Sequence, residues 1–414
     1  MAAPATLFPY RCSPYPDDAI GLTVMGQGES LCRRGSSAAL GAGAVAMEAG
    51  PQADAGREPA VRISSSRNFA SWLAERRASL AFTTYQAGKL FLIGTKADGQ
   101  LSIFERSFDR CMGLAGDGQT LWMSSRYQFW RLENALDAGE HGGHDRVYLP
   151  QASYITGDID AHDIGLDAKG RPIFVNTLFS CLARPSETHS FAPVWKPPFI
   201  SRLAAEDRCH LNGLAMRDGA PAYVTLVAQS DLADGWRDRR RDGGALLDVG
   251  SGEAVATGLS MPHSPRWRDG RVWLLNSGLG EFGFINPNDG RFDVVAFCPG
   301  YARGLAFLDG FAIIGLSRPR DGAVTFEGLP LTERLTQAGA EPRCGLLVID
   351  LERGDVVEWL RIEGVVQELY DVVALPGVRR PSAIGFKSDQ IRRTITIGHS
   401  SPLGGTESMP FSRT

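Results

Sequence analysis

The stretch His210-Leu211-Asn212-Gly213-Leu214-Ala215, followed by the turn Arg217-Asp218-Gly219 and the apolar run 222–226, decides the fold of this chain. A Gly-Leu-Ala-like start, a polar turn and a second β-type run come in the same order at other places in the sequence. These starts lie roughly 40–65 residues apart, and such a period is the mark of a repeat architecture. The further starts are 112–115, 164–167, 265–268, 303–306 and, more weakly, 371–374.

A second hairpin closes each repeat, as in the runs 246–249 and 253–256. Four strands per repeat and six repeat starts predict an all-β fold, a six-bladed β-propeller. A β-sandwich is the rival fold, but it would not explain the spacing. The run 89–93 matches the second half of a repeat. We therefore expect the chain to enter in mid-blade, and C-terminal strands near 371–374 and 383–386 to complete that blade.

The two ends of the chain differ from this repeat region in amino-acid composition and periodicity. Residues 1–62 are rich in Ala, Gly, Pro and Ser without periodicity, which predicts a disordered extension, and Met25 and Met47 leave open a later start. Ser64, Ser65 and Ser66 offer an N-cap for a short amphipathic helix from Phe69 to about Arg77. We expect one propeller domain over 63–400, with a helix near 331–337 in the long loop 317–344, and a flexible tail over 401–414.

Composition narrows the function classes. The net charge of −4 gives no basic field for nucleic acid. The 7 cysteines are odd in number and contain no Cys-x-x-Cys pair, which argues against a disulfide framework or a zinc ribbon and favours a reducing cytoplasm. No run of 18 apolar residues exists, so we expect no membrane span. Nucleotide-binding fingerprints and a hydrolase nucleophile elbow are also missing from the sequence.

The candidate site comes from one column of the repeat, three residues before the glycine of each start. Three of the chain's 7 histidines fall in this column, in consecutive repeats. In a propeller the first strand of each blade lines the central channel, so equivalent residues of neighbouring blades should converge at its mouth. The column reads Arg110, His162, His210, His263, Tyr301 and Leu369.

Three neutral imidazoles that converge in this way suit a divalent transition metal such as zinc, iron or copper, with one coordination position open. Tyr301, Asp163 and Glu368 are candidates for further ligands or for acceptors of the imidazole N–H groups. Two alternatives stay open. The histidines are ordinary hydrogen-bonded channel residues, or they bind a substrate carboxylate or phosphate without a metal.

Neighbouring residues suggest how a substrate would be held. Asn212 and Arg303 lie two residues inward of the column, and Arg303 is suited to grip a carboxylate. Tyr85 and Gln86 belong to a Tyr-Gln pair that recurs in the next repeat, either as a structural corner or as a pocket wall. The loops 228–244 and 317–344 are long, and long ordered loops on one face of a repeat fold commonly build a binding site. The basic run 237–242 is expected to be a solvated loop.

Several stretches resemble an uncharacterised bacterial family of conserved hypothetical proteins. They include Tyr85-Gln86-Ala87-Gly88-Lys89-Leu90, Trp195-Lys196-Pro197-Pro198-Phe199-Ile200-Ser201 and Met261-Pro262-His263-Ser264-Pro265-Arg266-Trp267. The resemblance covers roughly residues 65–400 and implies a propeller-like fold, without an activity. More distantly, the architecture is similar to the six-bladed lactonase and strictosidine-synthase-like group, whose lactonases bind metal through Glu, Asn and Asp. This chain has histidines at that place.

Two functions follow as hypotheses. The first is a metal-dependent enzyme that acts on a small or peptidic substrate, with His162, His210 and His263 as metal ligands and Asn212, Arg303, Tyr301, Tyr85 and Gln86 as substrate contacts. The alternative is a non-catalytic ligand-binding or protein-interaction propeller, for which an apolar stretch at 192–199 offers a surface. Both expect a small-molecule or peptide ligand, with no nucleic acid and no membrane as partner. The oligomeric state is open.

Overall fold

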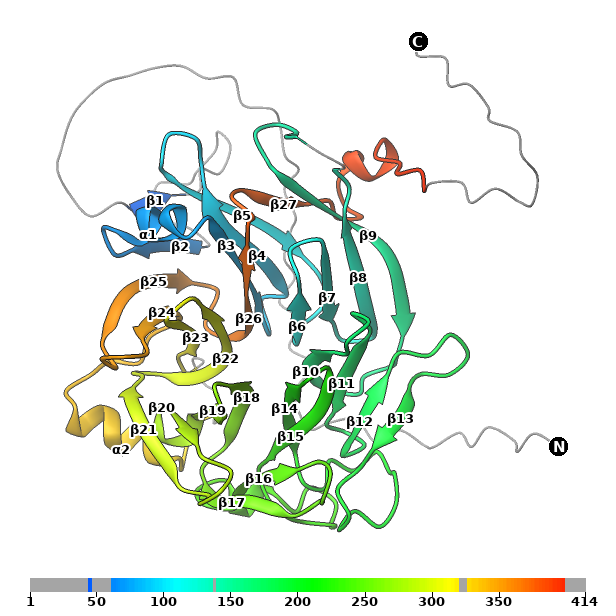
Figure 1. The fold of residues 1–414 in the computed structure, drawn as a ribbon, viewed down its shortest axis with the longest axis vertical. Helices are drawn as coiled ribbons and strands as arrows, with labels where there is room; N and C mark the ends of the chain where they lie inside the picture. Colours follow the sequence, from blue (N-terminus) through cyan, green and yellow to red (C-terminus); the bar gives the residue numbers. More distant parts are fainter. Residues whose placement is uncertain (1–43, 47–60, 137–138, 320–325, 399–414) are drawn as a thin grey trace.

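The computed structural model describes residues 44–46, 61–136, 139–319 and 326–398, and it is a six-bladed β-propeller (Figure 1). Each blade is an antiparallel sheet of four strands, and the blades are numbered here from the one that contains β3. Blade 1 consists of β26 (Leu369–Pro376), β3 (Ala78–Thr84), β4 (Lys89–Thr95) and β5 (Leu101–Ser107). Blade 2 consists of β6 (Leu114–Gly116), β7 (Thr120–Ser124), β8 (Gln128–Asn134) and β9 (Arg146–Ile155). Blade 3 consists of β10 (Ala161–Leu166), β11 (Pro172–Asn176), β12 (Cys181–Arg184) and β13 (Ala192–Trp195).

The remaining blades follow in chain order. Blade 4 consists of β14 (Leu211–Arg217), β15 (Ala220–Leu226), β16 (Gly244–Asp248) and β17 (Ala254–Leu259). Blade 5 consists of β18 (Pro262–Arg268), β19 (Arg271–Asn276), β20 (Glu281–Ile285) and β21 (Phe292–Phe297). Blade 6 consists of β22 (Tyr301–Leu308), β23 (Phe311–Ser317), β24 (Gly345–Asp350) and β25 (Val356–Gly364).

The helices lie outside the blades. They are α1 (Phe69–Glu75), α2 (Pro330–Gln337) and three 3₁₀ turns, η1 (Arg237–Arg239), η2 (Ser277–Leu279) and η3 (Asp389–Arg392). Helix α2 confirms the helix predicted near 331–337. No described helix has the length and apolar composition that a membrane span requires.

The ring closes through β26, which forms the inner strand of blade 1 beside β3. Blade 1 thus takes three strands from the N-terminal side and one from the C-terminal side, whereas the sequence suggested entry in mid-blade. The strand that was missed, β3, is buried at all seven positions. A strand buried on both faces shows no polar alternation, so its sequence carries little strand signal. The second expected C-terminal strand, β27 (Pro381–Ala383), instead pairs in parallel with β9 of blade 2.

The glycine of the repeat signature has a packing reason. A Cβ atom on Gly113 would lie 2.8 Å from the carbonyl oxygen of His162 in the next blade, and one on Gly304 would lie 2.8 Å from Cα of Asp371. Successive inner strands contact each other around the channel, and the ring is narrow enough that a side chain at this position would force the blades apart. The recurring Gly-Leu-Ala start therefore records how closely neighbouring inner strands approach.

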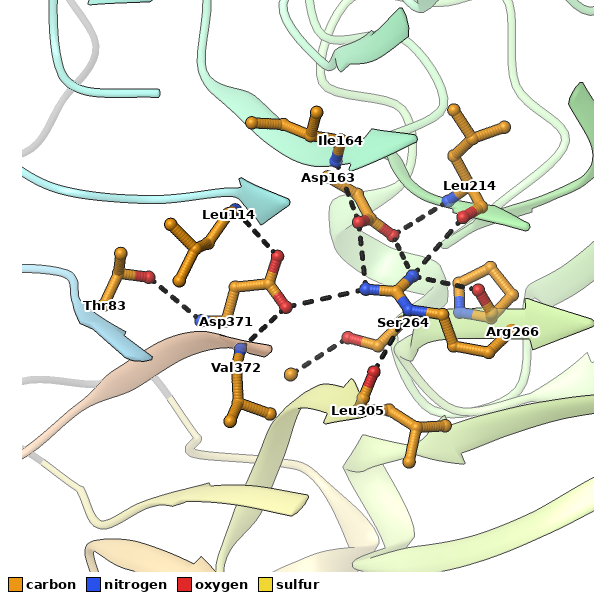
Figure 2. A network of polar contacts seen from close by, with 12 residues as sticks. Thr83, Leu114, Asp163, Ile164, Leu214, Ser264, Arg266, Leu305, Asp371 and Val372 are labelled. Carbon is orange, nitrogen blue, oxygen red and sulfur yellow. Dashed lines mark hydrogen bonds and ion pairs between the residues drawn. The ribbon is translucent and has the colours of Figure 1, made fainter. Parts of the chain in front are cut away.

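A buried ion-pair network crosses the channel (Figure 2). Arg266 of β18 donates to both oxygens of Asp163 of β10, at 2.8 and 3.1 Å, and lies 3.5 Å from Asp371 of β26. Asp163 also accepts the backbone N–H of Leu214, and Asp371 accepts that of Leu114. The network therefore joins the closing strand β26 to blades 2, 3, 4 and 5.

The N-terminal side adds strands to blade 6. β2 (Val61–Ser65) pairs with β25, and β1 (Ala44–Ala46) pairs with β2. The rest of the predicted extension and the tail from 399 lie outside the described residues. Helix α1 begins after Asn68 without a side-chain cap, so the expected serine cap is wrong. Ser66 instead bonds Glu358 and the backbone of Trp359, because it directly follows β2, which pairs with β25.

Candidate functional site

The three histidines converge at the start of adjacent inner strands, in blades 3, 4 and 5. The ring centroid of His162 lies 5.0 Å from that of His210 and 6.3 Å from that of His263. All three side chains are buried. In β10, β14 and β18 the ladder register shifts at or just beyond this position, and such bulges re-aim side chains near functional sites. The convergence predicted from the sequence column is therefore present.

Each imidazole is anchored through Nδ1. His162 Nδ1 lies 3.0 Å from the carbonyl oxygen of Asp160, His263 Nδ1 lies 2.8 Å from that of Met261, and His210 Nδ1 lies 2.8 Å from a carboxylate oxygen of Asp207. Carbonyl and carboxylate oxygens only accept hydrogen bonds, so these contacts assign the ring proton to Nδ1. In the tautomer that this assignment gives, the ring lone pair lies on Nε2.

Two hydroxyl groups reinforce this tautomer. Thr177 donates to the backbone carbonyl of Leu211 and lies 2.8 Å from His162 Nδ1, so its oxygen is left to accept the ring N–H. Ser277 donates to Ala302 and lies 3.2 Å from His263 Nδ1 in the same manner. A hydroxyl near the end of the second strand bonds the next inner strand in five blades, through Thr83, Ser124, Thr177, Ser277 and Ser317. Aligning the repeats on their second strands would have revealed this column.

Asn212, expected to contact a substrate, is already engaged within the site. Its Oδ1 accepts a hydrogen bond from Thr225 at 2.9 Å, and its Nδ2 lies 3.4 Å from Nε2 of His263. The amide is buried in β14. Asn212 therefore orients His263 in this structure.

The long loops cover the histidines, as their length suggested. Trp236, from the loop between β15 and β16, stacks on His210 with centroids 4.1 Å apart and donates its N–H to Asp207. Phe326, from the loop between β23 and β24, stacks on Tyr301 at 4.5 Å. We call these two loops the cap. Apolar residues of the cap form one buried cluster with Met261 and Tyr301, and the cap members include Val227, Trp236, Phe326, Leu329, Leu331 and Leu335.

The basic run 237–242 ties the two cap loops together. Arg240 donates to the carbonyl oxygen of Glu327, and Arg241 donates to that of Gly328 and pairs with Glu333. The run also contains η1 and is exposed over most of its length. A solvated loop was expected, and the structure adds this bracing role.

A ladder of aromatic and guanidinium groups runs beside the histidines. The guanidinium carbon of Arg303 lies 5.0 Å from the ring centroid of Tyr301 and 5.1 Å from that of Tyr370. Tyr370 stacks on Tyr85, and the guanidinium carbon of Arg110 lies 5.6 Å from the ring centroid of Tyr85. His263 packs against Tyr301 and His162 against Tyr370. The sequence column missed Tyr370, because the bulge in β26 shifts the register by which Leu369 was aligned.

Burial sets the protonation states. It lowers the pKa of His162 to about 4, and it lowers the pKa of His263 well below its usual range, with the charge of Arg303 acting in the same direction. Burial also raises the pKa of Tyr301 to about 12, and it raises the pKa of Tyr370 well above its usual range. Burial opposes ionisation of Asp160, but His162 and Arg110 hold the pKa of this carboxyl below its usual range. At neutral pH the two imidazoles are therefore neutral beside a cationic Arg303.

Three other predicted residues lie differently from expectation. Asp163, considered as a further ligand or imidazole acceptor, instead binds Arg266 in the channel network. Gln86 is exposed, and within the described part of the chain nothing joins it to the histidines or Arg303. Glu368 is buried and contributes its charge to the stabilisation of protonated Arg303. The apolar stretch at 192–199 begins with the edge strand β13, where Val194 is exposed.

Backbone strain gathers around the same site. Asp160, Asp207, His210 and Met261 have φ values of 53, 40, 48 and 48°, in the left-handed region that non-glycine residues avoid. Each such residue costs of order 1–3 kcal/mol, and strain of this kind clusters at functional sites. Here the strained residues are His210 itself and the Nδ1 acceptors of all three imidazoles.

The described residues contain no preformed metal geometry. Within residues 61–136, 139–319 and 326–398, no three His, Cys, Asp or Glu side chains are already placed to hold one metal ion. The five cysteines in these ranges, Cys111, Cys181, Cys209, Cys298 and Cys344, are free and buried. A surface hollow of about 590 Å³ lies away from the histidines between blades 5 and 6, beside Trp273 and Phe311.

Fold and site together define a six-bladed propeller with a capped polar cluster at its channel mouth. A family described as a domain of unknown function (DUF4915) matches residues 67–384. The chain belongs to this family. No curated protein matches it.

Solved structures give distant likenesses in fold. A nidogen/laminin complex is similar with 13% identity and a TM-score of 0.45, over 73% of this chain and 99% of that one. A streptogramin B lyase is similar with 13% identity and a TM-score of 0.36, over 57% and 72%. A protein of unknown function from Bacteroides caccae is similar with 12% identity and a TM-score of 0.35, over 72% and 98%.

Proposed function

We propose that this chain is an enzyme that acts on a small or peptidic substrate at the three-histidine site, with His162, His210 and His263 as ligands of a divalent transition metal. Zinc, iron and copper all accept imidazole nitrogen. Such a metal would polarise a carbonyl group or activate a water or oxygen molecule. The protein's own part is to supply imidazoles with a fixed tautomer and a cap that excludes water.

The anchoring of Nδ1 on all three rings carries this proposal. Metal-bound histidines characteristically donate the other ring N–H to a carboxylate or a backbone carbonyl, which fixes the tautomer and the ring plane. Asp207 serves His210 in this way, and backbone carbonyls serve His162 and His263. The same Nδ1 anchoring on three neighbouring rings leaves the Nε2 lone pairs of His162 and His210 without a protein partner, while Nε2 of His263 faces Asn212.

The spacing sets a condition on this proposal. Three imidazoles on one tetrahedral zinc have ring centroids roughly 5 Å apart, because each Zn–N bond is about 2 Å long. The His162–His210 pair meets this spacing at 5.0 Å, and His263 at 6.3 Å from His162 would have to move inward. Its Nε2 would then give up the 3.4 Å contact with Asn212.

Metal analysis of the full chain tests this. Protein purified without chelator should hold about one equivalent of a transition metal by mass spectrometry, and cobalt substitution should give the d–d spectrum of a low-coordinate site. His162→Ala, His210→Ala and His263→Ala should each lose the metal. His189→Ala, at an exposed loop position, is the matched control. The same trace metal content in wild type and all four variants would overturn the metal assignment.

The alternative function is a propeller that binds a ligand without metal. Arg303 favours it, because a permanent cation beside the imidazoles lowers their pKa and repels any other cation. This alternative predicts that ligand binding persists after dialysis against a chelator. A footprint on β13 or another blade edge instead of the channel mouth would point to protein interaction.

A further inference from the structure

We infer that the ligand of this site carries a carboxylate group, which Arg303 binds between Tyr301 and Tyr370. The inference rests on the proposed function of the three-histidine site but does not depend on the metal proposed there. It extends the function by naming a substrate class, a small molecule or peptide with a free monoanionic carboxylate.

The first observation is a set of buried polar atoms without partners. Among the described residues, nothing accepts a hydrogen bond from Nε of Arg303, and the hydroxyl groups of Tyr301 and Tyr370 have no partner other than the Arg303 guanidinium between them. The two rings flank the guanidinium at 5.0 and 5.1 Å. Unsatisfied buried donors are rare and costly in folded proteins, and three in mutual contact indicate a missing acceptor.

The other arginines of the channel provide an internal comparison. Arg266 has Asp163 and Asp371, and Arg110 has Asp158. Among the described residues no carboxylate forms an ion pair with Arg303, and its guanidinium has only the neighbouring hydroxyl group of Tyr301 as a side-chain hydrogen-bond partner. A guanidinium fork suits a carboxylate or phosphate through two parallel N–H contacts. The protein supplies carboxylate acceptors to Arg266 and Arg110, and we expect a ligand to supply the acceptor for Arg303.

Charge favours a carboxylate over a phosphate. Asp160 is held ionised near His162 and Arg110, and Glu368 contributes negative charge beside Arg303. A phosphate dianion would add two negative charges where one free cation faces these carboxyl groups, and in a buried site the repulsion is weakly screened. A carboxylate adds one charge, and the neutral tyrosine hydroxyl groups can donate to it without a change in protonation.

The position of Arg303 relates this anion subsite to the histidines. Tyr301 packs on His263, and Tyr370 packs on His162, at centroid distances of 5.6 and 5.3 Å. A ligand anchored by its carboxylate on Arg303 would therefore place its adjoining atoms beside the imidazoles. The carboxylate would serve as a handle, and the imidazoles would face the part of the ligand where chemistry takes place.

Calorimetric titration of the full chain tests this, with benzoate and N-acetylglycine as carboxylates, benzamide as their neutral counterpart, and inorganic phosphate. Wild type should bind the carboxylates and bind benzamide at least about tenfold more weakly. Arg303→Gln should lose the carboxylates by at least about tenfold, and Tyr370→Phe should weaken them by a smaller factor. Arg217→Gln is the matched control, because Arg217 lies over Tyr223 and Trp267 away from the site.

Folding gives a second readout. If Arg303 awaits a ligand, Arg303→Gln without ligand should unfold at the same temperature as wild type or higher, because an unpaired buried cation is removed. A structural role would instead lower that temperature. Three results would overturn the inference: equal binding of benzoate and benzamide, phosphate preferred over every carboxylate, or no carboxylate bound at tens of millimolar. Titrations with and without chelator separate the two proposals, since loss of the metal alone would leave carboxylate binding intact.

Discussion

Replacing Arg266 by methionine should destabilise the propeller strongly. The guanidinium makes two hydrogen bonds to Asp163, lies 3.5 Å from Asp371 and donates to the carbonyl oxygen of Leu305. Both carboxyl groups are only 3% exposed, so water cannot replace the lost cation. Breaking a buried ion pair from one side costs about 3–5 kcal/mol. We therefore expect the free energy of unfolding of Arg266→Met to fall by about that amount.

The same strand supplies the control. Arg268 pairs with Asp269, whose side chain is 80% exposed, and exposed pairs contribute at most about 1 kcal/mol. Urea unfolding followed by circular dichroism should therefore place Arg268→Met close to wild type and Arg266→Met well below it. Adding Asp163→Asn to Arg266→Met should restore part of the loss, because the cost arises from the carboxylates left unpaired. If Arg266→Met lies within about 1 kcal/mol of Arg268→Met, the channel network does not hold the ring closed.

Three further predictions concern the channel and the cap. Burial raises the pKa of Asp371 to about 7, above its unfolded value of about 4, so the folded state keeps a proton that the unfolded state releases. Stability of the wild type should therefore fall as pH rises from about 4 to about 7, and Asp371→Asn should remove that part of the slope in urea unfolding. Thr177→Val should cost about 1–2 kcal/mol of stability and leave His162 free to change tautomer, which ¹⁵N imidazole shifts would detect; unchanged shifts would contradict it. Trp236→Leu should loosen the cap over His210, so that limited proteolysis cuts the loop between β15 and β16 faster than in wild type; an unchanged cleavage rate would argue that other contacts hold the loop.

The sequence predicted the inner strands better than the rest of the fold. Gly113 and Gly304 repeat because neighbouring inner strands leave no room for a Cβ atom, so a packing constraint appears directly as a sequence period. β3 has no such mark, since both of its faces are buried and its polarity does not alternate. Strand β2 was also missed, because its partner β25 lies some 300 residues further along the chain.

For the site, the column of histidines was enough to place the three imidazoles together, but their partners could not be read from it. Asp207 and Trp236 reach His210 from a turn and from a long loop, where no period relates them to the strand. Tyr370 was hidden by the bulge in β26, which moves one residue out of register. Side chains that arrive from bulges and loops are set by tertiary packing, so local pattern carries little information about them.

The contents of the histidine column bear on function because the fold does not require them. The equivalent position in blade 1 holds Leu369, which is fully buried and serves the same inner-strand start. Burying imidazoles at this position is unfavourable unless their nitrogen atoms are hydrogen-bonded. In this chain, residues with strained backbone and two hydroxyl groups provide those hydrogen bonds to the Nδ1 atoms. Those arrangements satisfy one side of each ring and leave Nε2 of His162 and His210 to another partner. For a purely structural role, Leu could be buried at this position at a lower cost in free energy than His. The polarity of the column is therefore best explained by what the Nε2 side of the rings binds.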